Sequence, residues 1–221
     1  MKRFFALILA VTMMLTLAAC QNSAPAESDS EGDSETANST NVQTEGDSHM
    51  LVAYFSLAGE QYGVGVIEEG NTSIIAHMIA EQTGADLFEI KPETPYPTTY
   101  QELLDVSQQE MADNARPEIV GTVDNMDDYD TIFIGYPNWW GDMPMIVYNF
   151  LESYALSGKT IVPFCTHGGS GLSTTESTIA DITGGTMKDG FAIPGTTAQN
   201  DRDTARSKVT EWLKEGGFAE E

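Results

Sequence analysis

Residues 50–59 read MLVAYFSLAG, an apolar run that ends in a serine and a glycine. The aliphatic and aromatic residues at 50–55 predict a strand, and the lack of polar alternation predicts that both faces of this strand are covered. Four more runs of this kind follow, at residues 86–90, 131–135, 160–164 and, more weakly, 187–193. Together they predict five strands, several of them covered on both faces.

Helical patterns separate these runs. Between the first two strands, Ile74, Ile75, Met78 and Ile79 recur at the spacing of one helix face, which predicts a helix over residues 71–83. Similar patterns cover residues 100–114, 143–154, 174–182 and 201–214. Strict alternation of strand and helix is typical of an α/β fold with a doubly wound parallel sheet and helices on both faces.

Ligands of such sheets bind beyond the carboxyl ends of the strands, so the loops after strands carry the functional prediction. The first loop begins with Ser56, Leu57, Ala58 and Gly59, continues through an insertion at residues 60–70, and ends with Asn71 and Thr72 at a helix start. Hydroxyls and free amides at a helix N-terminus suit a phosphate. No Lys or Arg occurs between Arg3 and Lys91, which excludes a Walker A loop and favours a single phosphate monoester.

The second loop contains Pro137, Asn138, Trp139, Trp140 and Gly141. Two adjacent tryptophans at a strand end cannot both enter the core, so at least one is expected to line a pocket, where it would stack on a flat aromatic ligand.

The third loop, after the fourth predicted strand, contains Thr166, His167, Gly168, Gly169 and Gly171. Its glycines allow the backbone to approach a ligand closely. His167 either touches the ligand edge or shapes the turn. Leu172 interrupts the match to a nucleophile elbow, so a serine hydrolase is not expected.

These three loops, in this order, resemble those of the flavodoxin family. Residues 54–59 with Asn71 and Thr72 are similar to its phosphate loop, although Ala58 replaces a usual hydroxyl residue and residues 60–70 are inserted. The loops at 137–141 and 166–171 resemble its two isoalloxazine loops. The resemblance covers residues 51–213 and implies a five-stranded parallel sheet in the order 2-1-3-4-5.

The resemblance also implies FMN as the cofactor, with its phosphate on Ser56, Asn71 and Thr72. One tryptophan, for which Trp140 is favoured, would stack on the ring, and backbone near Gly141 and Gly168 would meet the polar edge of the ring. No catalytic side chain and no metal site are predicted.

The N-terminus predicts export. Lys2 and Arg3 precede an apolar run that ends in Leu-Ala-Ala before Cys20, which resembles a bacterial lipobox. We expect a signal peptide at 1–19, a disordered acidic tether at 20–49 and the folded domain at 50–221. An uncleaved anchor helix, or cleavage elsewhere, is the alternative. The predicted location is extracytoplasmic, with the membrane contacted only through lipidated Cys20.

The formal net charge of −24 argues against nucleic acid as a partner. A redox protein or a small electron acceptor is expected instead. Three functions stay open: an FMN-dependent electron carrier, an NAD(P)H-dependent flavin reductase acting on quinones or similar acceptors, and a non-redox binding lipoprotein. The fold alone does not separate them.

Overall fold

The computed structural model describes residues 49–220. The predicted signal peptide, Cys20 and all but the last residue of the predicted tether lie outside the described residues. Within residues 49–220, no helix has both the length and the apolar character needed to cross a bilayer.

The central sheet is parallel and runs in the order β4-β1-β5-β6-β7, with β8 also paired to β6. Its strands are β1 (Met50–Tyr54), β4 (Asp86–Glu89), β5 (Thr131–Pro137), β6 (Thr160–His167), β7 (Thr186–Met187) and β8 (Phe191–Pro194). The α/β doubly wound fold is therefore confirmed, and so is the order 2-1-3-4-5, apart from the last strand.

The prediction of one strand at residues 187–193 was wrong, because this strand is split into β7 and β8 and the sheet has six strands. The Lys188 amide still donates to the Ile161 carbonyl of β6 at 2.9 Å, but at the next two residues backbone groups bond to side chains instead. The Asp189 carbonyl accepts a hydrogen bond from the Trp212 indole at 3.0 Å, and the Gly190 amide donates to Glu176 at 3.0 Å.

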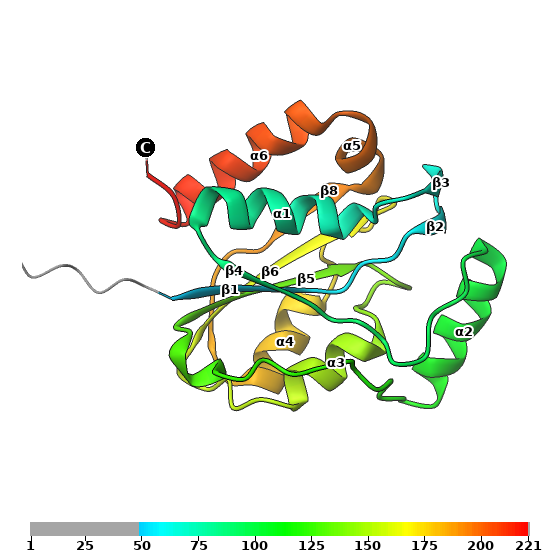
Figure 1. Cartoon of the computed structure of the whole chain (residues 1–221), viewed down its shortest axis with the longest axis horizontal. Helices are drawn as coiled ribbons and strands as arrows, with labels where there is room; N and C mark the ends of the chain where they lie inside the picture. The colour runs from blue at the N-terminus through cyan, green and yellow to red at the C-terminus, as the bar shows by residue number, and fades with distance from the viewer. Residues whose placement is uncertain (1–48, 221) are drawn as a thin grey trace, which may run out of the picture. The chain divides into compact units, whose positions relative to one another are not determined.

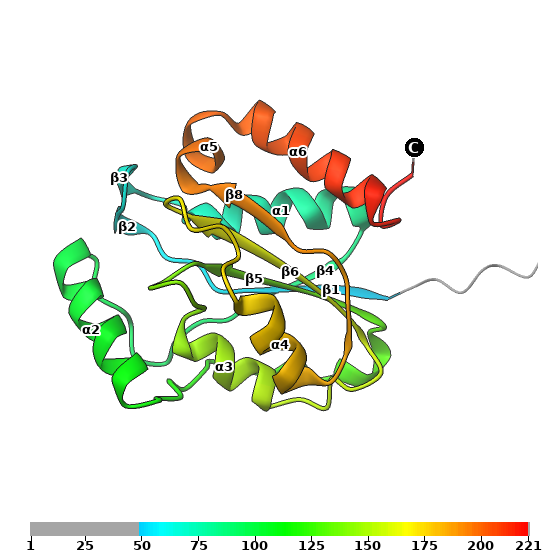
Figure 2. The same ribbon diagram turned by 180° about the vertical axis from the view of Figure 1, so that it is seen from behind.

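Helices cover both faces of this sheet (Figure 1). Helices α1 (Asn71–Thr83), α5 (Gly195–Asn200) and α6 (Arg202–Glu215) lie on one face, and α3 (Met145–Glu152) and α4 (Thr175–Thr183) lie on the other. Figure 2 shows the same layers from behind. The short helix α5 was not predicted from the sequence.

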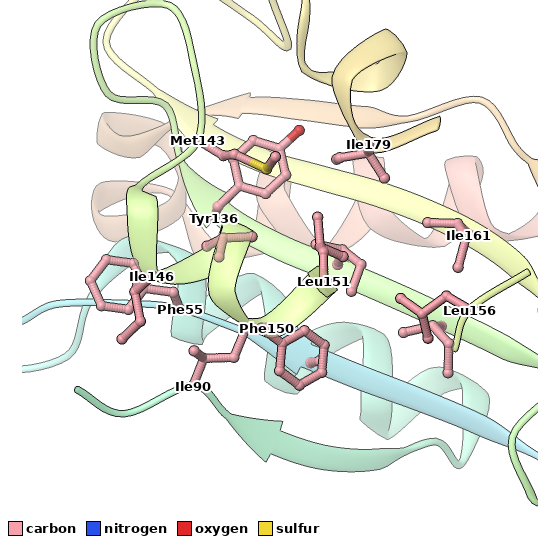
Figure 3. Close-up of a cluster of buried hydrophobic side chains, with 14 of the residues drawn as sticks. Phe55, Ile90, Tyr136, Met143, Ile146, Phe150, Leu151, Leu156, Ile161 and Ile179 are labelled. Atoms are coloured by element: carbon pink, nitrogen blue, oxygen red, sulfur yellow. The ribbon is translucent and has the colours of Figure 1, made fainter. Parts of the chain in front are cut away.

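Alternate residues of the strands enter two separate cores. Leu51, Ala53 and Phe55 from β1 and its end pack toward α3 and α4, while Val52 and Tyr54 pack toward α1 and α6. Figure 3 shows the first core, in which Phe150 and Leu151 of α3 lie over the sheet. Burial on both faces explains why β1, β5 and β6 lack polar alternation.

Two further elements stand beside the sheet, at the carboxyl ends of its strands. The predicted insertion forms an antiparallel hairpin of β2 (Gly59–Gln61) and β3 (Gly65–Ile67). Helix α2 (Tyr100–Ala112) lies next to this hairpin, away from the sheet (Figure 1). Leu103 and Ser107 are its buried residues, so most of its surface is free.

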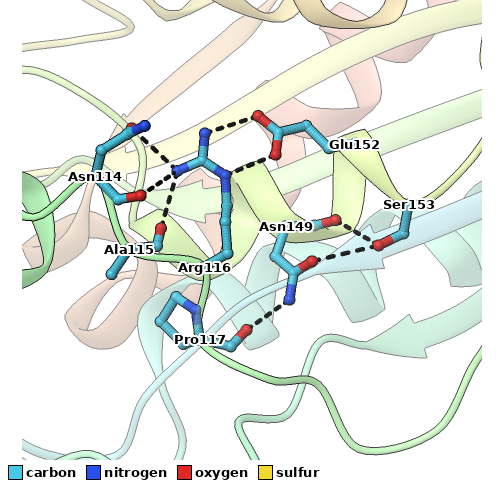
Figure 4. A network of polar contacts seen from close by, with 7 residues as sticks. All are labelled: Asn114, Ala115, Arg116, Pro117, Asn149, Glu152 and Ser153. Atoms are coloured by element: carbon cyan, nitrogen blue, oxygen red, sulfur yellow. Dashed lines mark hydrogen bonds and ion pairs between the residues drawn. The ribbon is translucent and has the colours of Figure 1, made fainter.

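Side-chain contacts attach the loop after α2 to helix α3 (Figure 4). The Arg116 guanidinium forms a two-pronged ion pair with Glu152, with both N–O distances at 2.7 Å, and Asn149 donates to the Pro117 carbonyl at 2.8 Å. This pairing raises the pKa of Arg116 and lowers that of Glu152. Between residues 113 and 130 the only helical turn is η1 (Met126–Asp128).

Candidate functional site

A cavity of about 450 Å³ lies beyond the carboxyl ends of β5 and β6. Ten residues predicted for the site line it: Asn71, Pro137, Asn138, Trp139, Trp140, Gly141, Thr166, His167, Gly168 and Gly169. The other predicted residues, all of them described, lie outside its lining: Ser56, Leu57, Ala58, Gly59, Thr72 and Gly171. The structure therefore brings the three predicted loops together at one cavity.

Helix α1 begins at this cavity. Its N-cap residue, Gly70, offers no side chain, and Ser56 caps the helix instead, with its Oγ accepting from the Ser73 amide at 3.0 Å. The Ser56 hydroxyl keeps its own proton to donate. The hydroxyls of Thr72 and Thr166 pair at 2.8 Å beside this helix start. Because the first amides of a helix have no intrahelical acceptor, they are available to an anion.

Asn71 carries an unusual atom. Its Oδ1 is buried and has no hydrogen-bond partner, and it is the one such side-chain atom found in residues 49–220. Behind it, Gly195 leaves room for the amide, since a Cβ there would lie 2.5 Å from Asn71 Nδ2. A buried polar atom without a partner costs about 1–3 kcal/mol. A ligand that donates a hydrogen bond would remove this cost.

The aromatic loop is a tight turn. The Trp139 amide donates to the Asp142 carbonyl at 2.8 Å, and the Asp142 amide donates to the Trp139 carbonyl at 2.9 Å. Both central residues have positive φ, 58° at Trp140 and 83° at Gly141. This is the pattern of a type I′ turn. A tryptophan in the left-handed region is strained, and such strain is concentrated at functional sites.

The two tryptophans have different surroundings. The Trp139 ring packs edge-to-face on Phe55 and Tyr96, each at 5.6 Å between centroids. The Trp140 side chain is 49% exposed, and its indole N–H donates to Ser107 Oγ at 3.0 Å. This arrangement agrees with the preference for Trp140 as the stacking residue, whose role stays a prediction.

The glycine loop at 166–171 is held to the aromatic turn by Asn138. The Asn138 side chain donates to the Gly171 carbonyl at 2.9 Å and accepts from the Gly141 amide at 3.1 Å. His167 both shapes this loop and lines the cavity. Its Nδ1 accepts from the Gly169 amide at 2.9 Å, and burial lowers the pKa of the imidazole. The neutral ring thus keeps a proton on Nε2.

Comparison with known families decides where the chain belongs. The sequence model of the family described as Flavodoxin matches residues 49–215. The chain belongs to the flavodoxin family. No curated protein matches the chain significantly.

Solved structures agree with this membership. A protein of Bacteroides eggerthii assigned as a flavoprotein is 31% identical over 77% of this chain and 98% of its own, with a TM-score of 0.61. A similar one from Bacteroides uniformis is 30% identical over 76% and 98%, with a TM-score of 0.60. A flavoprotein of Lactobacillus acidophilus, crystallised with FMN, shares the fold at 23% identity over 68% and 95%, with a TM-score of 0.51.

Not every residue of the flavodoxin phosphate loop reaches the cavity. Leu57 packs against the first core. Gly59 begins β2, where its φ of 97° requires glycine. A Cβ at this position would also lie only 2.8 Å from the Thr98 carbonyl oxygen. These two residues therefore shape the loop and the hairpin rather than line the cavity.

The residues of two cavity walls were not among the predicted site residues. Gln61 and Tyr62 come from the hairpin, and Tyr100, Leu103, Leu104 and Ser107 come from α2. Helix α2 was predicted, but not as part of the site, and the insertion was predicted within the first loop without Gln61 or Tyr62 among the site residues. An aromatic residue, Tyr62, in a glycine-rich insertion was the available signal.

The cavity lining carries no permanent charge. Among its residues, all within the described part of the chain, there is no Lys, Arg, Asp or Glu. Cys165 lies outside this lining, is buried, and donates to the Gly171 carbonyl at 3.2 Å. Burial raises the pKa of this thiol to about 12, which makes it a structural group rather than a nucleophile.

Proposed function

We propose that this flavodoxin-family protein binds FMN and carries electrons between redox partners outside the cytoplasmic membrane, with Cys20 as its lipid anchor. Family membership supports FMN as the cofactor, and the Lactobacillus acidophilus relative was crystallised with it. The location rests on the signal sequence and lipobox at the N-terminus.

The observation that carries the FMN proposal is the unpartnered Oδ1 of Asn71 beside the open start of α1. FMN has both an anionic group for the start of α1 and hydroxyl donors for Asn71. Its phosphate suits the first amides of α1 and the hydroxyls of Ser56 and Thr72, and its ribityl hydroxyls can donate to Asn71. Trp140, the Gly168 backbone and the His167 Nε2–H would then meet the ring.

When bound, FMN supplies the redox chemistry, and the protein supplies position and electrostatics. The uncharged lining and the acidic surface disfavour added negative charge at the ring, so the reduced cofactor is expected to be a strong reductant. The acidic surface also favours a redox partner with a basic docking face.

Titration of the purified protein with FMN and with riboflavin tests this proposal. FMN should bind about 1:1, and riboflavin much more weakly, because it lacks the phosphate. Equal affinity for the two would show that the start of α1 is not a phosphate site. Anaerobic reduction, followed by the visible spectrum, should proceed with dithionite but not with NADH or NADPH.

An NAD(P)H-dependent flavin reductase is the second candidate. The walls from the hairpin and α2 favour it, because they extend the cavity beyond the three flavin loops. The lining opposes it, because the described cavity residues offer no Lys or Arg to the phosphates of a pyridine nucleotide. Rapid reduction of the bound cofactor by either nucleotide would reverse this ranking.

A further inference from the structure

Two tyrosines stand at the mouth of the cavity without a role in the core. Tyr62, on the hairpin, is 66% exposed, and Tyr100 begins α2. Their ring centroids lie 6.2 Å apart with an interplanar angle of 36°. An exposed aromatic side chain gains little from folding, so Tyr62, paired with the half-buried Tyr100 in the cavity lining, indicates a ligand.

The position of this pair is fixed by polar contacts between the hairpin and α2. The Glu60 carboxylate accepts from the Tyr100 amide at 2.9 Å and so caps α2 from outside the helix. The Glu60 amide donates to the Thr98 carbonyl at 2.8 Å. On the other side, Gly168 admits the Tyr62 ring, since a Cβ at residue 168 would lie 2.7 Å from it. The hairpin is thus held between α2 and the glycine loop.

Helix α2 sets the distance between this pair and the aromatic turn. Tyr100 meets Tyr62, whereas Ser107, seven residues later, binds the Trp140 indole. At about 1.5 Å per residue, these positions are roughly 10 Å apart along the helix. Flat rings in contact are about 3.5 Å apart, so the wall that α2 gives to the cavity is longer than the spacing of two stacked rings.

The chemistry of the walls selects an uncharged second ligand. Leu103 and Leu104 line the cavity between the two ends of α2, and no charged side chain joins them among the described lining residues. Burial of an unpaired charge there would be costly. Acidic residues on the nearby segments, Glu60 and Glu68 on the insertion and Glu102 on α2, repel anions further.

We propose that the hairpin and α2 form a second binding site, for a flat, uncharged aromatic molecule such as a quinone that exchanges electrons with the cofactor. The proposal rests on the proposed FMN function. A quinone that gains two electrons and two protons becomes a hydroquinone. The electrons and the protons would come from the two-electron-reduced cofactor, which would thereby be oxidised. The hairpin, absent from the flavodoxin phosphate-loop pattern, would be the structural addition that creates this site.

The test uses 1,4-naphthoquinone and its 2-sulfonate, which carries a negative charge on a similar ring. Their binding to the oxidised, FMN-loaded protein is measured by equilibrium dialysis, which needs no turnover. The rate at which each reoxidises dithionite-reduced protein is measured separately by stopped flow. Tyr62→Ala and Tyr100→Ala are compared with Val66→Ala, a control on the same hairpin whose side chain is 81% exposed and outside the cavity lining.

Each tyrosine variant should bind naphthoquinone about five- to tenfold more weakly, as expected for the loss of one stacking partner. FMN affinity should stay within about twofold of the parent, and the control should match the parent throughout. The sulfonate should bind at least about tenfold more weakly than the neutral quinone.

Three results would overturn the second site. Unchanged quinone binding in both tyrosine variants would remove it, and loss of FMN in these variants would assign the walls to the cofactor. Equal binding of the sulfonate would remove the charge argument. Failure of the parent protein to bind FMN at all would instead refute the proposed function, and quinone binding that still depends on the two tyrosines would then support the site by itself.

Discussion

Replacement of Trp140 by Asn should separate the effect of the strained backbone on stability from the effect of the indole ring on FMN affinity. Trp140 sits at φ 58°, followed by Gly141 at 83°. A non-glycine residue in the left-handed region costs about 1–2 kcal/mol, whereas Asn tolerates it well, and Asn-Gly is the preferred pair of a type I′ turn. Trp140→Asn should therefore be about 1 kcal/mol more stable than Trp140→Ala, which keeps the strain but also loses the ring.

Both variants should lose FMN affinity to a similar extent. A tryptophan side chain presents about 150–250 Å², and 49% of this one is exposed. About 100 Å² is thus available to a ligand, which at about 25 cal/mol/Å² contributes roughly 2 kcal/mol, or about thirtyfold in the dissociation constant.

Trp139→Ala is the matched change at the neighbouring residue. Its ring is partly buried against Phe55 and Tyr96, so its loss should cost about 2–4 kcal/mol of stability. Urea unfolding of the apo-protein and FMN fluorescence titration measure the two quantities. If Trp139→Ala loses the flavin while Trp140→Ala unfolds the domain, the two roles are exchanged. If the Asn and Ala variants of Trp140 are equally stable, the turn carries no strain.

Three other changes test separate parts of the chain. Asn71→Ala should weaken FMN binding about tenfold in a fluorescence titration without lowering apo-protein stability, because it removes a buried oxygen that lacks a partner. Because the pKa of His167 is lowered in the folded protein, the unfolded chain takes up its proton first, so the free energy of unfolding should fall as the pH drops below about 6.5; His167→Gln should flatten this part of the profile. Cys20→Ser should release the protein from the membrane fraction or leave an unprocessed precursor, and normal maturation of the variant would refute the lipobox.

The three central strands of the sheet could be predicted because they are buried on both faces. Val52 and Phe133 face one core and Leu51 and Ile132 face the other, so a continuous apolar run was a sufficient signal. The last strand lacked this signal. At Asp189 and Gly190 the pairing is decided by two distant side chains, and no local pattern reports such contacts.

The site was predictable where it follows strands and unpredictable where it does not. The loops at 137–141 and 166–169 reach the cavity because parallel strands end at one edge. The hairpin gave no strand signal, since residues 59–67 are rich in glycine and have little alternation. Nor does an amphipathic pattern show which partner a helix has. Helix α2 buries Leu103 and Ser107, and only the structure shows that they face a cavity.

Three local costs of this fold meet at the same cavity. Asn71 Oδ1 lacks a partner, Trp140 has a strained backbone, and Tyr62 exposes most of its ring. Departures of this kind persist where function requires them. A ligand that relieves them binds the native state alone, so FMN at about a hundred times its dissociation constant should stabilise the protein by about 2.7 kcal/mol. A melting temperature that does not rise with FMN concentration would show that these costs serve something other than the cofactor.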